Sequence, residues 1–465
     1  MSTIFKNINE LDMGTFTQEV YSTAIYGQLS EDFSDWDMLK SRTVNIPPSK
    51  LYNYDMVTGY APAGTQRVNP GQSNRPFPKP FSIGTQEGVA RFKEIAQTIA
   101  VDAQLVDRLQ KSGQKADAIS LAQQIYFSGI SQKRVLAKEI YQDGTGRLGY
   151  AASATAGGDG KFTVTLDSSK IGHVGWFDRD DILVHTNATN TGAGGSAVTG
   201  GTADHAYWKV LERNRRKNQI TLQSLNSSFQ ETTVDTWTPA ATDTFLRFGQ
   251  PEAQSGVVGV NLESISDDLG LYTPMVGLES LAANDGRLVH QVNLSGFLGA
   301  THEDAEGEVI DVKHIEANLN DLKINTGGGT YNWKYMCMAP ETRSALVEGR
   351  ETDRRFHAVK DDTRGVVTFR YIHEDDNLEV KGSEFIPKDV IWHIPEAKGS
   401  NKKVIELVND DIAVVKTGNM ADFHLGFDAA TGSRTDTYEQ YLRGHNMLIC
   451  THPASVGKIK GFTIS

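Results

Sequence analysis

The glycine-rich hexapeptide at 144–149, Gly-Thr-Gly-Arg-Leu-Gly, has the G-x-G-x-x-G spacing of dinucleotide-binding loops. That chemistry needs a strand before the glycines and a helix after them, because the phosphate sits at the N-terminus of the helix. In this sequence a predicted helix precedes the glycines, and the small-residue stretch 150–154 follows them. The context therefore predicts a turn that leads out of a helix, and no nucleotide site.

Two histidines stand beside acidic residues, in His302-Glu303-Asp304 and in the run from His373 to Asp376. Neighbouring side chains on a strand point to opposite faces, so few of these groups can converge on one ion. Neither run has the i, i+4 histidine pair of a zinc protease. We therefore predict a polar turn at each run and no resident metal. A divalent cation at an acidic contact between subunits stays open.

A basic run occupies the turn of a hairpin predicted over 210–222, and it holds Arg213, Arg215, Arg216 and Lys217. The run has three interpretations: a phosphate patch or nuclear-import signal, a solvated hairpin tip, or a charge anchor between subunits. The formal net charge of the chain is −12. Because a nucleic-acid-binding surface is normally basic, the net charge favours the tip or the anchor over nucleic acid.

No local signature of a common enzyme class is present in the sequence. The G-x-S-x-G elbow, the H-E-x-x-H motif and the P-loop lysine are missing, and the triple glycine at 327–329 lacks that lysine as well. Serines, histidines and aspartates could still meet in space as a triad. Cys337 and Cys450 are the only cysteines, so they offer no metal quartet and no disulfide framework. We predict no enzymatic activity and no cofactor.

Length and composition bound the class of protein. At 465 residues, the chain has the mass of about three domains. Hydrophobic residues make up 38% of it, and its 44 glycines favour turns and hairpins over a helical bundle. No apolar run reaches the length of about 18 residues that predicts a membrane span, and the N-terminus lacks the features of a secretory signal. Synthesis in the cytosol fits these properties.

The element that must position these motifs is a long helix predicted over 115–142. Apolar residues recur along it at helical spacing, at Ile119, Ala122, Ile125, Ile130, Leu136 and Ile140. A helix of about 28 residues is roughly 42 Å long, enough to cross a protein as a beam. Asp143-Gly144 ends it, since glycine is typical just past the last helical turn.

Upstream of this helix the sequence divides into three segments with different predicted structures. Residues 1–39 could form surface helices or an arm that packs on a neighbouring subunit. Residues 62–80 hold five prolines, which exclude helix and central strand. The aromatic residues around them favour an ordered, contact-making loop over a solvated linker. After this loop, apolar residues recur at helical spacing, which predicts a short helix over 89–109.

Downstream of the helix, most predicted elements are strands. A small β-barrel or sheet module is predicted from strands at 161–166, 181–185, 206–211, 219–222 and 244–248. A helical stripe ending near Asn325, a strand at 333–338 and a helix beginning at Pro340 follow. Residues 351–465 are predicted to be mostly strands, and the chain closes with a final strand, a proline and a polar turn.

The long helix that ends in Tyr-Gln-Asp-Gly-Thr-Gly-Arg-Leu-Gly resembles the spine helix and following turn of tailed-bacteriophage major capsid proteins. The order of elements at 309–349 resembles the core of their axial domain. The resemblance implies an α+β fold with an N-terminal arm, an extended loop, a spine helix with a peripheral β-sheet domain, and an axial α/β domain, here with a β-rich insertion. It suggests this division: arm 1–39, extended intersubunit loop 40–98, spine helix and peripheral domain 99–160, β-rich peripheral or insertion domain 161–255, axial domain 256–420 and C-terminal return strands 421–465.

The resemblance also implies a structural function, which is self-assembly into the icosahedral head that encloses the double-stranded DNA of a tailed phage. Implied partners are further copies of the chain in hexamers and pentamers, a scaffolding protein, a portal, a decoration or cement protein, and the packaged DNA, bound without sequence specificity; no membrane is implied. The implied location is the virion capsid, assembled in the host cytoplasm. Predicted intersubunit contacts are Arg75, Phe77, Lys79, Phe81, Arg213, Arg215, Arg216 and Lys217. An encapsulin-type compartment shell and a β-rich hydrolase or binding protein are the open alternatives.

Overall fold

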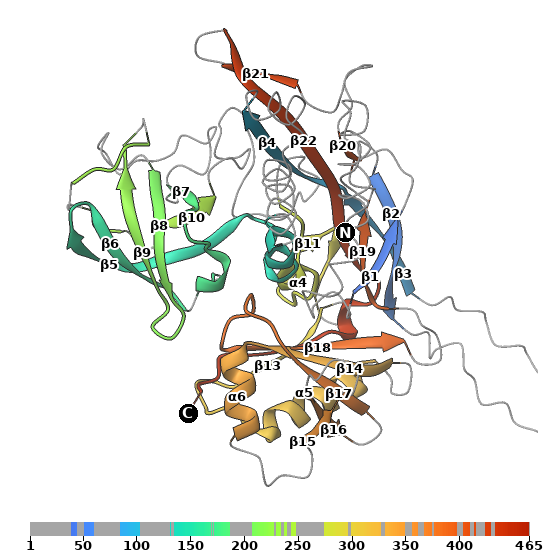
Figure 1. Cartoon of the computed structure of the whole chain (residues 1–465). Helices are drawn as coiled ribbons and strands as arrows, with labels where there is room; N and C mark the ends of the chain where they lie inside the picture. Colours follow the sequence, from blue (N-terminus) through green and yellow to red (C-terminus); the bar gives the residue numbers. More distant parts are fainter. Residues whose placement is uncertain are drawn as a thin grey trace, which may run out of the picture.

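The computed structural model of the chain describes residues 39–43, 51–59, 84–102, 131, 134–168, 170, 172–186, 207–226, 229–233, 237–239, 243–247, 274–295, 299–326, 331–348, 356–360, 367–373, 376–397, 403–409, 413–414, 424–428 and 433–464. These residues form a sheet-rich α+β molecule in which a six-stranded barrel, a six-stranded sheet and a seven-stranded sheet are arranged around the helix at 134–141 (Figure 1).

The barrel is closed by six strands in the order β10-β5-β6-β9-β8-β7. These are β5 (Arg147–Gly158), β6 (Lys161–Leu166), β7 (Ile182–Thr186), β8 (Tyr207–Asn214), β9 (Gln219–Leu225) and β10 (Thr244–Arg247). Side chains alternate between the two faces of a strand, and in β6 the inward ones, beginning with Phe162, are all buried. Inside the barrel Phe162 meets Trp208 and Trp237 edge to face, with ring centroids 5.5 and 5.8 Å apart. The interior is therefore a packed aromatic core.

A seven-stranded sheet with two helices forms the second part, in the strand order β13-β23-β18-β14-β17-β16-β15. Its strands are β13 (Thr301–Asp304), β14 (Tyr331–Met338), β15 (Phe356–Lys360), β16 (Val367–His373), β17 (Asp376–Gly382), β18 (Val390–Ala397) and β23 (Gly457–Lys460), and its helices are α5 (Val312–Asn325) and α6 (Pro340–Glu348). The carboxylate of Asp311 caps α5 by accepting from the amide of Val312 at 2.5 Å. The buried stripe of α5 then packs on β13 and β23.

A six-stranded sheet, the third part, brings together distant parts of the chain. It contains β1 (Lys40–Thr43), β4 (Lys93–Asp102), β19 (Ile405–Asn409), β20 (Ala413–Val414), β21 (His424–Asp428) and β22 (Ser433–Cys450). β22 runs through the whole sheet and pairs with four of the other strands (Figure 1). Because β1 and β4 come from the first quarter of the chain and β22 from its end, this sheet joins the beginning of the chain to its end.

Small elements connect these parts: the hairpin of β2 (Leu51–Gly59) and β3 (Gly84–Arg91), the 3₁₀ turns η3 (Val174–Trp176) and η8 (Pro453–Ser455), the helix α4 (Leu278–Leu281), and the hairpin of β11 (Leu288–Val289) and β12 (Val292–Asn293). Residues 134–141 form the last turns of the predicted long helix. The segment after them turns through Gly144 and Gly146, both with positive φ, into β5. The predicted helix stop is confirmed, and the glycine-rich hexapeptide is the turn.

Three predictions are wrong in detail. The helix predicted over 89–109 is replaced by β3 and β4 up to residue 102. Ile95, Ile99 and Val101 also fit the alternation of a strand, and all ten residues of β4 pair with β22. The polar turn predicted at 302–304 is the strand β13, paired with β23. The chain does not close on a polar turn after Pro453, because β23 follows and enters the seven-stranded sheet.

The other elements predicted after the helix are confirmed, and most of their observed ends lie within three residues of the predicted ends. Five of the six barrel strands, α5, β14 and the start of α6 at Pro340 lie where the sequence places them, whereas the barrel strand β5 was not predicted. The predicted turn at 373–376 joins β16 to β17, where His373 pairs with Asp376. The predictions for 1–38, for 62–80 and for the helix before 131 fall outside the described residues. None of the described helices is long and apolar enough to cross a membrane.

Candidate functional site

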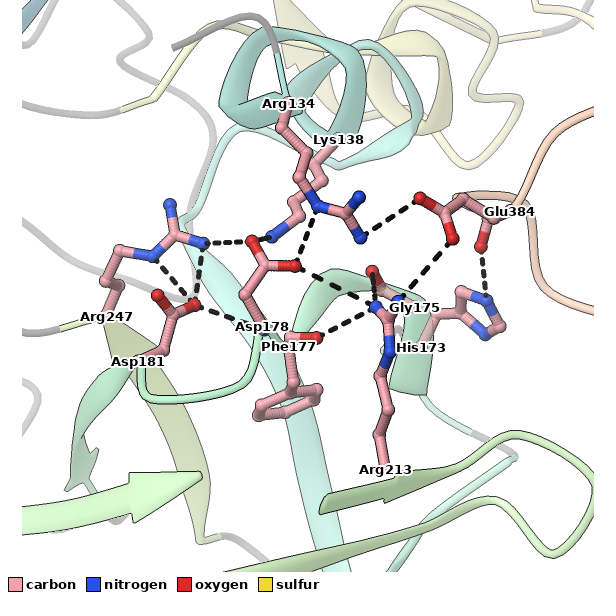
Figure 2. Close-up of polar contacts among 10 residues, drawn as sticks. All are labelled: Arg134, Lys138, His173, Gly175, Phe177, Asp178, Asp181, Arg213, Arg247 and Glu384. Carbon is pink, nitrogen blue, oxygen red and sulfur yellow. Dashed lines mark hydrogen bonds and ion pairs between the residues drawn. The ribbon is translucent and has the colours of Figure 1, made fainter. Parts of the chain in front are cut away.

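A cluster of seven charged side chains lies where the helix at 134–141, the barrel and the seven-stranded sheet meet (Figure 2). We call this cluster the junction. Its members are Arg134, Lys138, Asp178, Asp181, Arg213, Arg247 and Glu384. Two come from the helix, four from the barrel and the turn that enters it, and one from the loop between β17 and β18. The junction is therefore where the orientations of three parts of the molecule are fixed.

Asp178 is the centre of the junction. Its carboxylate accepts a hydrogen bond from Nε of Arg134 at 2.9 Å and a short one from Nζ of Lys138. The guanidinium groups of Arg213 and Arg247 approach it to 3.8 Å. Arg247 is held in place by Asp181, with Nη2 and Oδ2 2.9 Å apart. One carboxylate thus binds both the helix and two strands of the barrel.

Glu384 connects the same cluster to the seven-stranded sheet. Its two carboxylate oxygens contact Arg134 at 3.0 Å and Arg213 at 3.6 Å (Figure 2). The backbone around it is also bound, because Nε1 of Trp176 donates to the carbonyl of Phe385 at 2.9 Å. A side chain at Gly175 would lie 2.3 Å from the carbonyl oxygen of Glu384, so only glycine allows this approach. The η3 turn and the loop after β17 are therefore packed backbone to backbone.

The basic hairpin turn predicted from the sequence belongs partly to this site. Arg213 reaches Asp178 and Glu384, and it donates to the carbonyl of Phe177 at 3.1 Å. Arg215 pairs with Glu341 at the start of α6, at 3.1 Å. Arg216 and Lys217 are exposed at the tip of the turn.

The four loop residues, Arg75, Phe77, Lys79 and Phe81, fall outside the described part of the chain. The role of all eight predicted residues as contacts between subunits stays a prediction.

Burial and neighbouring charges shift the pKa values of ionisable groups at and beside the junction. The ammonium of Lys138 is almost fully buried, and this desolvation, with the nearby charge of Arg247, lowers its pKa to about 8 despite the carboxylate of Asp178. Burial would raise the pKa of Asp178, but Lys138 and Arg134 outweigh it, and the pKa lies below its ordinary value. Desolvation and then Arg215 lower the pKa of His173 to about 3, so this imidazole is neutral at neutral pH.

The C-terminal end of the helix is enclosed by the segment at 274–283. The hydroxyl of Ser280 donates to the carbonyl of Asp143 at 2.7 Å, which satisfies one carbonyl that the end of a helix leaves free. A side chain at Gly277 would lie 2.2 Å from the carbonyl oxygen of Glu139 and 2.3 Å from that of Gln142. The helix end and this segment therefore touch through their backbones, without intervening side chains.

The base of the β2–β3 hairpin is held by the tip of the β11–β12 hairpin. His290 and Gln291 form that tip, both with positive φ. The carbonyl of His290 accepts from the amide of Val89 at 2.9 Å, and its Nδ1 lies 2.5 Å from the hydroxyl of Tyr54. Burial, and then the charge of Lys93, lower the pKa of His290 to about 3, so the ring stays neutral. The hairpin is therefore fixed at its base to the body of the molecule.

Glu139 is a buried carboxyl beside this helix end. Desolvation raises its pKa to about 7 from a reference value of 4.5, although the amide of Met275 donates to it at 3.4 Å. When folding raises the pKa of a carboxyl group, the group makes its full contribution to the free energy of unfolding at pH values below its pKa in the unfolded chain. That stability is lost as the pH rises from 4.5 towards 7, where the native state must carry a buried charge.

Glu139→Gln is therefore expected to make the chain more stable than the wild type above pH 7, by on the order of 2–3 kcal/mol, since one pKa unit is worth about 1.36 kcal/mol. The difference should shrink as the pH falls to 4.5. Urea unfolding of both chains across this pH range measures it. Glu231→Gln, a change at an exposed carboxyl, is the control and should show no such pH dependence. An unfolding difference for Glu139→Gln that is flat across the range would contradict this account.

The junction holds no arrangement suited to covalent chemistry. Its carboxylates are paired with arginine and lysine, and the neighbouring His173 is buried, with Nε2 3.2 Å from the carbonyl oxygen of Glu384. In the part of the chain that the structure describes, no group of three or more His, Cys, Asp or Glu residues could hold a metal ion. Nε2 of His302 lies 2.8 Å from the carbonyl oxygen of Ala282. The arrangement serves to hold parts together.

Sequence reasoning found Arg213, and the neighbouring Arg215, but missed the other six members of the junction. Arg134 and Glu384, for example, are 250 positions apart, and no spacing rule links them. The helical pattern places Lys138 and Glu139 between the apolar residues, yet both are buried, because the end of the helix is covered on every side. The one local signal was the acidic turn at 178–181, directly after two aromatic residues.

No protein-family model matches this sequence, and no curated protein matches it. Among solved structures, the cyanophage A-1(L) capsid matches 92% of this chain and 93% of its own chain, at 7% identity and a TM-score of 0.43. The procapsid of satellite phage P4 matches 95% and 91%, at 8% identity and a TM-score of 0.38. An encapsulin of Synechococcus elongatus PCC 7942 matches 36% and 54%, at 10% identity and a TM-score of 0.24. Most of the solved structures that match over most of this chain are phage capsid proteins.

Proposed function

We propose that this protein is the major capsid protein of a tailed bacteriophage, which self-assembles into the icosahedral head around the double-stranded DNA genome. The observation that carries the proposal is the end of the helix at 134–141. There the sequence motif that resembles the one in tailed-phage capsid proteins forms the turn through Gly144 and Gly146 that leads directly into the barrel. The enclosing segment at 274–283 fixes this turn to the rest of the chain.

The mechanism that we propose is geometric. The junction holds the helix, the barrel and the seven-stranded sheet in one orientation, and the contacts of His290 fix the β2–β3 hairpin. A subunit with several rigidly oriented parts can contact several neighbours at once. Each contact can then be weak, because the second and later contacts form at a high effective concentration. Weak single contacts also let a wrongly placed subunit leave before the shell closes.

The proposed partners follow from this role. Further copies of the chain in hexamers and pentamers form the wall, and a scaffolding protein, a portal and a decoration protein complete the assembly. The packaged DNA is enclosed rather than bound at a specific site, in keeping with the net charge of −12, which opposes tight binding to phosphate. The proposed place of the protein is the capsid of the virion.

Deleting residues 69–80 is expected to leave a soluble chain that does not form particles, because these residues belong to the loop that we propose reaches a neighbour. They lie outside the described residues, so the expectation rests on the sequence. Size-exclusion chromatography with light scattering measures the result. Deleting residues 190–201, a polar segment of the same length that the sequence predicts to be a loop, is the matched control and should leave assembly unchanged. Normal particles from the first deletion would refute this role of the loop.

A further inference from the structure

The outer surface of the barrel carries an uncharged patch on β5, β6 and β9. We call it the threonine face, and its members are Ser153, Thr155, Thr163, Thr165, Gln219 and Thr221. They lie in two rows across the strands, since Thr155 pairs with Thr163 and Thr163 with Thr221, and Ser153 with Thr165 and Thr165 with Gln219. The residues between them in β6 and β9 are fully buried, so these six point outwards.

Among the residues that the structure describes, this face points away from the junction side of the barrel. In the closed ring of strands, β6 and β9 lie opposite β7 and β10, and the β7–β10 side carries Arg247 and the turn with Asp181 to the junction. The barrel projects from the body of the molecule, with β5 and β6 at its outer side (Figure 1). The hydroxyl and amide groups of the face are short, and Gln219 bonds to Thr165 at 3.1 Å, which keeps the face flat. Ser153 and Thr155 are exposed, and the other four members are half-buried.

Charges of opposite sign flank the face. Lys161 begins β6 on one side, and Glu212 of β8 pairs with Thr221 on the other. Both are exposed, and neither has an ion-pair partner among the residues that the structure describes. In a contact between two copies related by a twofold axis, residue i of one copy meets residue j of the other, and j meets i. Such a contact would pair Lys161 with Glu212 twice.

We infer that the threonine face is a contact surface for the same face of a second copy of this chain. Hydroxyl and amide groups donate and accept hydrogen bonds, so the face is complementary to itself. Each copy carries a net charge of −12, and a face without carboxylates is where two such copies can approach with least repulsion. Six small side chains give far less than the roughly 800 Å² per partner of a stable interface, so the contact is weak by itself.

This inference rests on the proposed shell function, because a contact so small persists only where other contacts hold the copies together. The test places cysteine at Thr163 and treats assembled particles with a short bismaleimide, which can span the roughly 10 Å between packed sheets. Cys337 and Cys450 are buried and give little background. Arg179→Cys, an exposed position on the far side of the barrel, is the control.

We expect Thr163→Cys to give a covalent dimer of two 51.0 kDa chains and Arg179→Cys to give none. Lys161→Glu and Glu212→Lys should each lower the dimer yield of Thr163→Cys several-fold, and the two together should restore it. Particles that form normally without this dimer, or a cross-linked product that contains a different protein, would overturn the inference and leave the proposed function intact. A chain that forms no particles under any assembly condition would overturn both.

Discussion

Replacing Asp178 with asparagine is expected to lower the free energy of unfolding by about 3 kcal/mol, because the change leaves the buried ammonium of Lys138 without its carboxylate. Arg134, Arg213 and Arg247 would then face one another around a neutral amide. Because the pKa of Asp178 lies below its ordinary value, the stability that it contributes is present at neutral pH and is lost as the pH falls below 3.8. Urea unfolding at pH 7 and at pH 3 measures both effects.

Asp180→Asn is the matched control for this prediction. Asp180 is two positions away and pairs with Lys209 at 3.1 Å, but both side chains are at least one-third exposed. An exposed ion pair contributes at most about 1 kcal/mol. Adding Lys138→Met to Asp178→Asn should recover part of the lost stability, since it removes the unpaired buried charge. Equal effects of Asp178→Asn and Asp180→Asn would show that the junction does not hold the parts together.

Gly277→Ala is expected to cost at least about 3 kcal/mol and to loosen the segment at 274–283 from the helix end. The new methyl group would lie 2.2 Å from the carbonyl oxygen of Glu139, 2.3 Å from that of Gln142 and 2.7 Å from that of Ile140. Backbone oxygens cannot rotate away as a side chain can, so the cost reaches the upper end of the range for overpacking. Hydrogen exchange of the amides in both segments should rise in the variant.

The backbone of Gly277 has a φ of −97°, which any residue can adopt, so the expected loss comes from space alone. Gly382→Ala is therefore a fair control: its added methyl would meet nothing closer than Cδ of Arg343 at 3.5 Å, an ordinary contact. We expect that control to unfold within about 0.5 kcal/mol of the wild type, as substitutions away from special features do. A Gly277→Ala chain as stable as Gly382→Ala would mean that the helix end is not enclosed as described.

Local patterns predicted much of the fold where one pattern dominates. The alternation at 161–166 is β6 residue for residue, and Pro340 begins α6. Prediction was wrong where two patterns coincide: Phe92, Ile95 and Ile99 have the phase of a helix, but pairing with β22 made the segment a strand. β5 was missed because its small residues carry neither a helical nor a strand signal. The division of the chain into six consecutive segments stays a prediction.

The junction shows why a site of this kind escapes sequence reasoning. Catalytic motifs are local, but an ion-pair cluster between parts of a chain is assembled by the packing of those parts. Arg215 and Glu341 lie 126 positions apart and meet only because the barrel sits beside α6. The basic run was noticed because its charges are consecutive, whereas the single carboxylates of Asp178 and Glu384 have nothing local to distinguish them.

Negative-stain electron microscopy of the purified full-length chain, with size-exclusion chromatography of the same sample, tests the central claim most directly. The proposed function predicts closed hollow particles, tubes, or rings with fivefold and sixfold symmetry. Particles that contain an enzyme rather than DNA when isolated from the native host would point to a compartment shell instead of a phage head. A chain that stays a 51.0 kDa monomer in high salt, under crowding and with added scaffolding protein would contradict the account.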